Sequence, residues 1–570
     1  MDYKTIYQQW LENATADSDL VEELQSIKNQ DAEIEERFYK ELEFGTAGLR
    51  GVIGAGTNRM NVYIVGKATQ GIAQYVNGAF ENPSVAVAYD SRIKSELFAK
   101  TTASVFAANG IKVYLYKELM PTPMLSFAVR YFGCAAGVNV TASHNPAKYN
   151  GYKVYGEDGC QLTIEATNTV VGHIETIDTF SGIETMDFDK ALEQGLIEYI
   201  GDDCIESYYD AVYKKAINPS VFADGKFKVV YTPLHGAGNK PVRAILKKCG
   251  VENVVVVKSQ ELPDGNFPTA PYPNPEIKQA FQEALKVAEV EKPDILLATD
   301  PDSDRVGIAV KSGEEYRLMT GNEVGVMLLN YVLSQRKALG TLPKDPVAVK
   351  TIVTSELAQM VADKYGCKLI NVLTGFKFIG EQIALLEEKN EDDRFVFGFE
   401  ESYGYLAGSY VRDKDAVIAS MLICEMAAFY KSLGKTLIDV MNDLYAEFGN
   451  YLHAQFSFEF EGISGMKRMK EIMADFRENA PKEFNGFAVE TISDYQASVS
   501  TDVKTGKSQE ILLPKSNVLA YDLEKGAQVV VRPSGTEPKI KIYLTVVEDS
   551  AAAATALKEK FEKYFNELIK

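Results

Sequence analysis

Short apolar runs alternate with longer stretches of helical periodicity through most of the chain. In the first third, residues 85–88, 112–115 and 136–140 form short runs that are mostly apolar, and stretches with helical spacing separate them. Apolar runs of this length, bounded by polar loops, are typical of buried strands. Because strands that alternate with helices form βαβ units, the pattern predicts a mixed or parallel sheet.

The same order of strand, polar loop and helix recurs twice further along the chain. Residues 228–231 lead into the loop 232–238, and residues 347–350 lead into the loop 351–355. The recurrence predicts three related α/β modules in a row. The alternative is that these stretches share only the common βαβ pattern.

The two ends of the chain differ from this plan. Residues 1–43 are acidic and have a helical pattern. From about residue 453 the character changes, and strands at 529–531 and 540–546 are followed by a terminal amphipathic helix. We therefore expect the last segment to fold differently from the three modules.

The composition indicates a globular protein that acts on small molecules. The chain has 570 residues, of which 46% are hydrophobic and 25% charged, enough for several cores. Its formal net charge of −20 argues against a general affinity for nucleic acid or an anionic membrane, although local cationic pockets for phosphate remain compatible with it.

Cysteine usage and the termini bear on the compartment. The six cysteines are scattered without a Cys-x-x-Cys pair, which indicates neither a zinc site nor a disulfide framework. The first residues lack a basic-then-apolar signal, and the longest apolar run, 416–430, is too short for a membrane span and contains Glu425. We expect a cytoplasmic protein with no membrane or nucleic-acid partner.

The first candidate for chemistry is Ser143. His144 follows it directly, and Lys153 lies ten residues on. Together they supply a nucleophilic hydroxyl, a group that titrates near neutrality and a mobile cation, which are the parts that transfer to an alcohol requires. A predicted strand precedes the serine and Pro146 prevents a helix after it, so we expect an exposed turn. An ordinary polar loop is the alternative interpretation.

A glycine-flanked arginine occurs earlier, at Arg50. Gly48 and Gly51 allow the backbone to approach a ligand while the guanidinium offers a forked contact, so Arg50 is a candidate phosphate ligand. A surface turn with an incidental arginine would have the same sequence.

A predicted buried strand at 294–299 leads into three alternate aspartates. They are Asp300, Asp302 and Asp304. Carboxylates this close repel one another without a cation, and hard oxygen ligands suit Mg²⁺, so the pattern predicts a metal loop. A calcium EF-hand is excluded because its glycine position would be Arg305 and its glutamate position Lys311. A solvated acidic turn is the remaining alternative.

Two further loops carry polar groups suited to a sugar phosphate. Residues 397–404 place paired carboxylates, a hydroxyl and an aromatic ring between glycines, which is suitable for binding sugar hydroxyls. Residues 532–536 combine an arginine, two hydroxyls and a glycine into a predicted phosphate cradle. The two Gly-Lys-Ser/Thr segments, at 434–436 and 506–508, lack the leading glycine of a nucleotide loop, so ATP is not indicated.

These loops, in this order, resemble the α-D-phosphohexomutase superfamily over nearly the whole chain. The resemblance implies an α/β protein with three related mixed-sheet α/β domains and a smaller α+β C-terminal domain around a central cleft. On this basis we place the domains at 1–207, 208–322, 323–452 and 453–570.

The resemblance also implies roles for individual residues. Ser143 corresponds to the phosphoserine of the family, and with Asp300, Asp302 and Asp304 it would bind Mg²⁺. The residues that match positions assisting phosphoryl and proton transfer are Arg50, His144, Lys153 and Arg305. Those that match substrate-binding positions are Thr374, Gly375, Glu400, Ser402, Lys414, Arg532, Ser534, Gly535 and Thr536.

Within the superfamily, the Glu-Glu-Ser-Tyr-Gly loop at 400–404 is similar to that of the phosphoglucomutase and phosphopentomutase-like branch. Phe399 departs from the glycine common there, which leaves hexose against pentose open. We favour interconversion of glucose 1-phosphate and glucose 6-phosphate through glucose 1,6-bisphosphate. The alternatives are phosphopentomutase or phosphomannomutase activity, a metal-dependent sugar-phosphate phosphatase, and a non-enzymatic sugar-phosphate binding protein.

Overall fold

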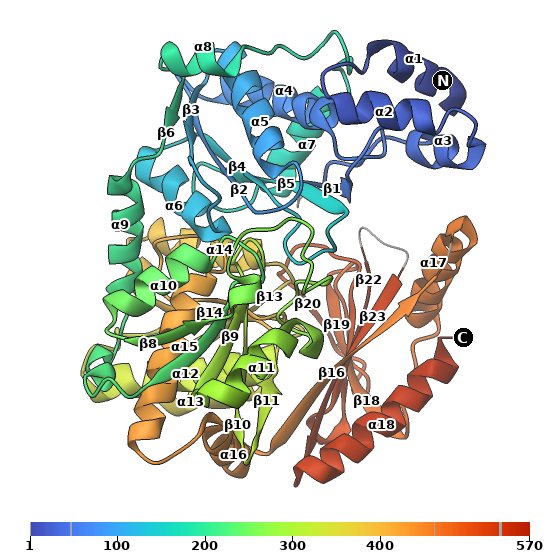
Figure 1. Ribbon diagram of the computed structural model, residues 1–570. Coiled ribbons are helices and arrows are strands. Elements are labelled where there is room, and N and C mark those ends of the chain that lie inside the picture. Colours follow the sequence, from blue (N-terminus) through green and yellow to red (C-terminus); the bar gives the residue numbers. More distant parts are fainter. Residues whose placement is uncertain (1, 46–47, 461, 535–538, 570) are drawn as a thin grey trace.

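A computed structural model describes residues 2–45, 48–460, 462–534 and 539–569 (Figure 1). Four sheets follow one another along the chain, each built from strands that are consecutive in sequence. The first three are mixed sheets accompanied by helices, and the fourth is antiparallel, which confirms the predicted fold class. We name the four units modules I to IV in chain order.

Module I has a six-stranded sheet in the order β1-β5-β4-β2-β3-β6. Its strands are β1 (Leu49–Val52), β2 (Ser84–Tyr89), β3 (Lys112–Leu115), β4 (Ala136–Val140), β5 (Tyr149–Gly156) and β6 (Ile197–Tyr199). Its helices are α1 (Tyr3–Asn13), α2 (Ser18–Ser26), α3 (Asp31–Phe38), α4 (Val62–Ala79), α5 (Ser95–Ala108), α6 (Thr122–Phe132), α7 (Ile164–Ile174) and α8 (Phe188–Glu193).

Module II has a five-stranded sheet in the order β11-β10-β9-β7-β8. Its strands are β7 (Lys228–Thr232), β8 (Asn253–Val256), β9 (Ile295–Thr299), β10 (Val306–Ser312) and β11 (Glu315–Met319). Its α-helices are α10 (Asn239–Lys248) and α11 (Gln282–Glu291).

Module III has a four-stranded sheet in the order β13-β12-β14-β15. Its strands are β12 (Val347–Thr351), β13 (Lys368–Val372), β14 (Phe395–Glu400) and β15 (Gly404–Leu406). Its helices are α12 (Gly321–Ala338), α13 (Leu357–Tyr365), α14 (Phe376–Glu387), α15 (Ala416–Ser432) and α16 (Leu437–Phe448).

Modules I to III share one strand plan. The first parallel strand of each module, β2, β7 or β12, lies between two parallel partners. The later of these partners, β4, β9 or β14, then turns back through a loop into an antiparallel strand. All five residues of β4 and of β9 are buried, as expected for strands covered on both faces. The common plan places three equivalent loops at the carboxyl ends of β4, β9 and β14.

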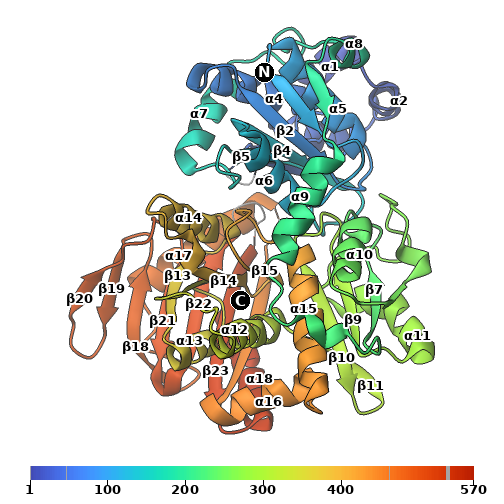
Figure 2. The same cartoon turned by 90° about the vertical axis from the view of Figure 1, so that its left-hand side faces the viewer.

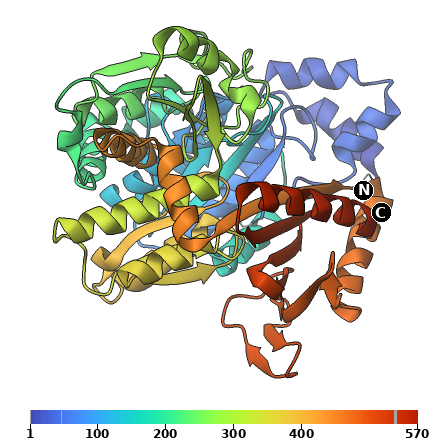
Figure 3. The same cartoon turned by 90° about the horizontal axis from the view of Figure 1, so that it is seen from below.

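Module IV is an antiparallel sheet of eight strands, of which β17 pairs only with β18. Seen from below, its orange and red elements lie to one side of the green and yellow modules (Figure 3). The strands are β16 (Asn450–Glu459), β17 (Glu483–Phe484), β18 (Phe487–Asp494), β19 (Val499–Asp502), β20 (Ser508–Glu510), β21 (Leu519–Leu523), β22 (Gln528–Pro533) and β23 (Lys539–Glu548). The helices are α17 (Gly462–Glu478) and α18 (Ala551–Leu568).

A single buried apolar cluster runs from one face of the first sheet through modules II and III. Helix α9 (Asp202–Tyr213) leads from module I to the modules below it (Figures 1 and 2) and packs against α6, α10 and α15. The expected division at 207/208 therefore falls within a helix that links two modules, and β16 begins three residues before the expected division at 452/453.

The other face of the first sheet has its own core with the N-terminal helices. Trp10 on α1 is 1% exposed and packs edge-on against Phe38, Tyr63 and Phe180, with ring centroids 5.5 to 5.8 Å away. The acidic, helical N-terminal segment is thus folded against module I.

Within the described ranges, none of the helices taken singly combines the length and the apolarity needed to cross a membrane. The consecutive helices α15 and α16, which are bent by 84° to each other, pass such a test together, by length and composition only.

Candidate active site

The three equivalent loops of modules I to III carry three of the groups singled out in the sequence. The serine loop joins β4 to β5, the aspartate loop joins β9 to β10, and the loop with Glu401 and Ser402 joins β14 to β15. Arg305, at the end of the aspartate loop, forms an isolated antiparallel bridge with Gly404 at the start of β15. The aspartate loop therefore lies between the other two.

Ser143 contacts the aspartate loop of the next module. Its Oγ donates to Oδ2 of Asp300 over 2.7 Å, and its backbone N donates to Oγ1 of Thr141 over 2.8 Å. The residue has φ of 51°, a conformation that side chains other than glycine adopt at some cost in strain. The expected exposed turn is wrong, because Ser143 is only 3% exposed. The loop is a turn, but the aspartate loop of module II covers it, which the local sequence does not reveal.

His144 lies beside the serine hydroxyl, with Nδ1 3.2 Å from Ser143 Oγ. Burial lowers the pKa of His144 well below its ordinary value, and the cations Arg305 and Arg50 lower it further. The imidazole is therefore uncharged at neutral pH.

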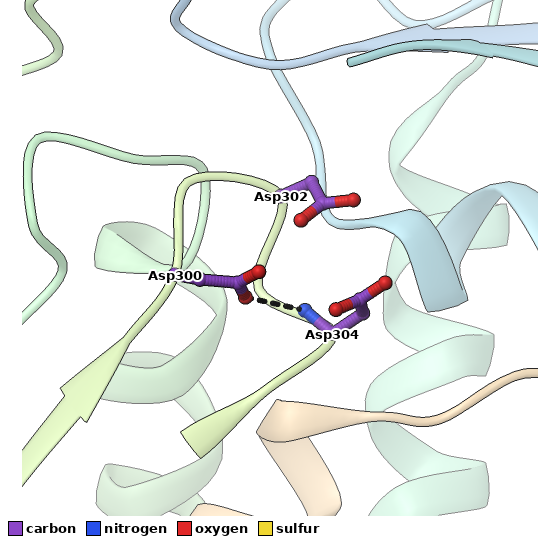
Figure 4. A group of neighbouring side chains, drawn as sticks. All are labelled: Asp300, Asp302 and Asp304. Atoms are coloured by element: carbon purple, nitrogen blue, oxygen red, sulfur yellow. Dashed lines mark hydrogen bonds between the residues drawn. The ribbon is translucent and has the colours of Figure 1, made fainter. Parts of the chain in front are cut away.

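The three aspartates point toward one another (Figure 4), and their ligand oxygens lie within 4.8 Å of one another. None is more than 1% exposed. Oδ1 of Asp300 accepts from the backbone N of Asp304 and of Arg305, over 3.1 and 3.0 Å, which fixes the turn. Burial raises the pKa of Asp300 well above its usual range, and the neighbouring carboxylates raise it further.

The cluster fits a metal ion. Oδ1 of Asp302 and Oδ1 of Asp304 are buried and accept no hydrogen bond from the part of the chain that the structure describes. An unpaired buried carboxylate oxygen is costly, and a cation between these two would satisfy both. A set made only of carboxylate and hydroxyl oxygens suits hard cations such as Mg²⁺, Ca²⁺ or Mn²⁺.

Two lysines approach the same cluster from modules I and III. Lys153 Nζ lies 2.7 Å from Asp302 Oδ2 and 3.0 Å from Asp304 Oδ2. Burial acts to lower the pKa of Lys153, but these two carboxylates outweigh it and hold that pKa above its usual value. Lys414 Nζ lies 3.1 Å from Asp304 Oδ2. Both lysines therefore remain charged.

The expected sugar-binding residue Lys414 thus lies at the junction of the sugar and aspartate loops. Its Nζ also contacts Oδ1 of Asp413 over 3.1 Å. The next residue, Asp415, caps α15 by accepting from the backbone N of Val417 and Ile418 over 2.7 and 3.2 Å. A cap of this kind stabilises a helix by about 1 kcal/mol and here fixes the chain that carries Lys414.

Two of the expected arginines, Arg50 and Arg305, contact residues next to the serine and aspartate loops. Arg50 is on β1, opposite Gly151 in register, and its Nη1 lies 3.2 Å from Asn145 Oδ1 in the serine loop. Arg305 Nη1 lies 2.7 Å from Oε1 of Glu276. Burial acts against the charge of Arg305, but Glu276 and Asp304 outweigh it and raise its pKa.

Glu400 connects the expected sugar loop to the segment 374–377. Its Oε1 accepts from the backbone N of Gly375 over 3.0 Å. Burial raises the pKa of Glu400 to about 7; Lys414 opposes this shift and Glu401 adds to it. Ser402 is half-buried two residues further along the loop.

The predicted phosphate-binding loop of module IV, which begins at Arg532, also contacts the segment 374–377. Arg532, at the end of β22, contacts Oγ1 of Thr374 through Nη1 over 2.5 Å. The backbone N of Ser534 donates to the carbonyl of Lys539 over 2.8 Å. The other two expected members of this loop, Gly535 and Thr536, lie outside the described residues.

Sequence reasoning missed Lys541. It lies directly opposite Arg532 in the register of β22 and β23, so two cations share one face of the sheet. Burial lowers the pKa of Lys541, and Arg532 lowers it further. Like charges in directly opposed positions are destabilising, and a bound phosphate would relieve the repulsion. Polar and apolar residues alternate along 539–546, which places Lys541 on one face of a strand. Only the register of β22 and β23 shows that this face is shared with Arg532.

Sequence reasoning also missed Thr122, the first residue of α6. Its backbone N donates to the carbonyl of Asp302 over 2.8 Å, and its Oγ1 donates to Asp302 Oδ2 over 2.7 Å. The hydroxyl in turn accepts from Nδ2 of Asn139 over 2.7 Å. Module I therefore orients a carboxylate of module II. No pattern along the chain marks this contact, because the partners are 180 residues apart.

A serine hydroxyl held against a buried carboxylate cluster, on loops of successive α/β modules, is suited to an enzyme of phosphoryl transfer. Models of the phosphoglucomutase/phosphomannomutase domains match the chain in order. The α/β/α domains I, II and III match residues 41–181, 206–313 and 320–448, and the C-terminal domain matches residues 473–563. The chain belongs to the phosphoglucomutase/phosphomannomutase family.

Individual relatives agree with this assignment. A phosphoglucomutase of Staphylococcus saprophyticus is 36% identical over 564 residues, which covers 98% of this chain and 99% of the relative. A phosphoglucomutase of Staphylococcus aureus is 37% identical over 521 residues, covering 91% of this chain and 92% of the relative.

Solved structures resemble the fold. The phosphoglucomutase parafusin from Paramecium, in its open form, has a TM-score of 0.67 at 19% identity and covers 92% of this chain and 95% of its own. A phosphoglucomutase/phosphomannomutase family protein from Burkholderia thailandensis has a TM-score of 0.63 at 17% identity, covering 92% and 97%. At these identities the two structures support the fold only.

Proposed function

We propose that this protein is a phosphoglucomutase that interconverts glucose 1-phosphate and glucose 6-phosphate through a phosphoserine at Ser143. The observation that carries the proposal is the 2.7 Å contact between the Ser143 hydroxyl and the buried aspartate cluster. Relatives named phosphoglucomutase that match 98% and 91% of the chain support the same substrate.

The proposed reaction has two transfers. Phosphorylated Ser143 gives its phosphoryl group to the free hydroxyl of a bound hexose monophosphate, so the Oγ–P bond breaks and a bond from phosphorus to the sugar oxygen forms. The hydroxyl proton leaves to a nearby base, and we assign this role to His144, whose Nδ1 lies 3.2 Å from Ser143 Oγ. The glucose 1,6-bisphosphate then reverses its orientation in the site, and its other phosphoryl group is transferred back to Ser143.

The chain's own residues supply position and charge in this scheme. Asp300, Asp302 and Asp304, with the serine oxygen, would hold Mg²⁺, which when bound neutralises charge on the phosphoryl oxygens. Lys153 and Arg305 add positive charge at the aspartate loop. Because phosphoryl transfer needs little covalent help from the protein, this positioning accounts for most of the acceleration.

The sugar and its second phosphate have separate sites in the proposal. Glu400, Ser402 and Lys414 would bind hydroxyls, and Arg532 with Lys541 and Ser534 would bind the phosphate that is not being transferred. The arrangement explains how one site serves both half-reactions, since either phosphate of the bisphosphate can occupy the same clamp.

Phe399 does not by itself favour a pentose. Its ring is 1% exposed and lies over Gly325 of α12, where a Cβ added to the glycine would be only 2.1 Å from the ring. The side chain therefore fills the core instead of the sugar site.

The test compares substrates and acceptors. With Mg²⁺ and a trace of glucose 1,6-bisphosphate, kcat/KM should be larger on glucose 1-phosphate than on mannose 1-phosphate or ribose 1-phosphate. A preference for ribose 1-phosphate would make the protein a phosphopentomutase. Stoichiometric release of inorganic phosphate, without dependence on the bisphosphate, would make it a phosphatase and overturn the proposal.

A further inference from the structure

A buried ion pair lies beneath the serine loop, in the loop that follows β2. Asp90 is 2% exposed and Arg92 is 3% exposed, and Arg92 Nε lies 3.3 Å from Asp90 Oδ2. Neither side chain touches the three aspartates in the described part of the structure, so the proposed chemistry assigns the pair no role. A buried charge pair needs good geometry and further hydrogen bonds to offset the loss of hydration.

Arg92 makes those hydrogen bonds to the backbone of the serine loop. Its guanidinium donates to the carbonyls of Pro146 and Tyr149, each over 3.0 Å, and also to those of Ser143 and Asn145. Four carbonyls between residues 143 and 149 thus converge on one side chain. Only the planar fork of arginine offers enough fixed donors for this; a lysine ammonium has three donors at a single point.

Asp90 reaches the same loop by a second route. Its Oδ2 accepts from Oγ1 of Thr141 over 2.6 Å, and that hydroxyl oxygen accepts from the backbone N of Ser143 over 2.8 Å. Oδ1 of Asp90 accepts from the Arg92 backbone N and from Ser95 Oγ. The left-handed backbone of Ser143 is therefore held from both of its sides.

Module II packs directly on this pair. The ring of Phe267 lies against the Arg92 guanidinium, 5.1 Å from its centroid, and is fully buried. A Cβ added to Gly265 would lie 2.4 Å from the backbone N of Ile93, so the two loops meet without space for a side chain. Module II therefore makes two contacts here. The segment with Gly265 and Phe267 packs on the Asp90–Arg92 pair, and Asp300 accepts a hydrogen bond from the Ser143 hydroxyl.

We propose that Arg92, together with Asp90, is a positioning residue for phosphoryl transfer. The pair holds the 141–149 loop so that the Ser143 hydroxyl faces Asp300, and Phe267 fixes the pair against the module that carries the aspartates. The inference rests on the proposed phosphoserine chemistry. The competing explanation is a buried ion pair that serves only the stability of module I.

The first test is Arg92→Lys, which keeps the charge and loses the fork. Because misplacing a reacting group by about 1 Å costs roughly a hundredfold, we expect kcat to fall by about a hundredfold while KM changes by less than about threefold. Arg59→Lys is the matched control, since Arg59 is also largely buried in module I but contacts Glu36 and Asn58. That variant should keep its kcat.

A second readout does not depend on activity. Hydrogen exchange measured by mass spectrometry should become faster in peptides covering 141–149 of Arg92→Lys, and stay unchanged in peptides from the strands of module II. If Arg92→Lys does not fold, Thr141→Val breaks the link from Asp90 to the Ser143 backbone with little change of shape. It should lower kcat at least about tenfold with KM unchanged.

The outcomes separate this inference from the proposed function. Wild-type kcat in a folded Arg92→Lys or Thr141→Val variant, or unchanged exchange in 141–149, overturns the positioning role even if Ser143→Ala is inactive. An active Ser143→Ala protein overturns the phosphoserine function instead, and the exchange experiment then still decides whether Arg92 holds the loop. A loss of thermal stability with unchanged kcat would assign the pair to stability alone.

Discussion

The hydroxyl of Ser143 donates a hydrogen bond to Asp300 over 2.7 Å, although the two residues are 157 positions apart and belong to different modules. The contact exists because equivalent loops of modules I and II face each other. In the proposed mechanism, activity depends on how these two sheets pack against each other, as well as on the motifs in each.

Replacing Ser143 by alanine should abolish mutase activity, by at least about a thousandfold in kcat, because it removes the only oxygen that can carry the phosphoryl group in the proposed scheme. Ser420→Ala should retain wild-type kcat, because it removes a fully buried hydroxyl of α15 that has no hydrogen-bond partner among the residues that the structure describes. A coupled assay with glucose 1,6-bisphosphate measures both, and intact mass reports phosphorylation. Bisphosphate-dependent turnover by Ser143→Ala would contradict the phosphoserine mechanism.

Removing one carboxylate of the cluster should act on chemistry more than on binding. We expect Asp302→Asn to lower kcat by a hundredfold or more, on the order of 3 kcal/mol, with a small change in KM, because the metal acts on the transferring group. Thr122→Val, which loses the hydroxyl that orients Asp302, should lower metal affinity or activity by about 10- to 100-fold. Both are measured as activity against Mg²⁺ concentration after chelation.

The control for the metal prediction is Asp294→Asn. Asp294 precedes β9 and pairs with Lys431, so it shares the charge of the cluster residues but not their position. Its Mg²⁺ dependence should match the wild type. Full activity of the wild-type protein in thoroughly metal-free buffer would remove the metal assignment.

The phosphate clamp should matter equally in both directions. A charge-assisted hydrogen bond contributes roughly 1.5 to 3 kcal/mol, so Arg532→Ala should lower kcat/KM by about ten- to a few hundredfold, starting from either glucose phosphate. Lys541→Met should have a loss of similar order, since it faces the same side of the sheet. Lys525→Ala, an exposed lysine of the same module, should have no effect.

The clamp prediction has a clear contrary result. If Arg532→Ala impairs only one direction of the reaction, the clamp does not serve both half-reactions. If neither direction changes, module IV has another role.

The raised pKa of Glu400, about 7, gives a pH dependence. Because the pKa lies above the ordinary value, the side chain is protonated below about pH 7 and becomes a carboxylate above it. If sugar hydroxyls are bound by the carboxylate, kcat/KM should rise through about pH 7. Glu400→Gln keeps an oxygen that can accept the hydrogen bond from Gly375 N, so the variant should fold. It should not show the rise of kcat/KM through about pH 7.

The substrate itself titrates near pH 6, so the comparison must be made between the two proteins at each pH. The substrate contribution is common to both profiles. An identical rise in Glu400→Gln and wild type would show that Glu400 does not determine it.

Much of the site lies within single loops and was predictable for that reason. Asp300, Asp302 and Asp304 come from one turn after one buried strand, so the convergence of these candidate metal ligands follows from their spacing. The strands predicted at 85–88, 112–115 and 136–140 are confirmed as β2, β3 and β4. Short, mostly apolar runs between polar loops are typical of buried strands in a globular fold.

Contacts between modules were not predictable from one sequence. The burial of Ser143, the support of Asp302 by Thr122 and the bridge between Arg305 and Gly404 all join residues that no local period relates. Lys541 needed the register of β22 and β23, which depends on the whole sheet. Sequence patterns locate the loops, and packing decides what each loop faces.

The environment of Trp10 has a practical consequence for all these experiments. It is the chain's single tryptophan, and it is buried among Phe38, Tyr63 and Phe180 at the junction of the N-terminal helices with α4. Emission excited at the red edge of indole absorption therefore reports on the loosening of module I alone, while circular dichroism averages over all four modules. Denaturation curves that coincide by both signals would show that the modules unfold together, and a fluorescence transition at lower denaturant would identify module I, and with it the serine loop, as the first part to open.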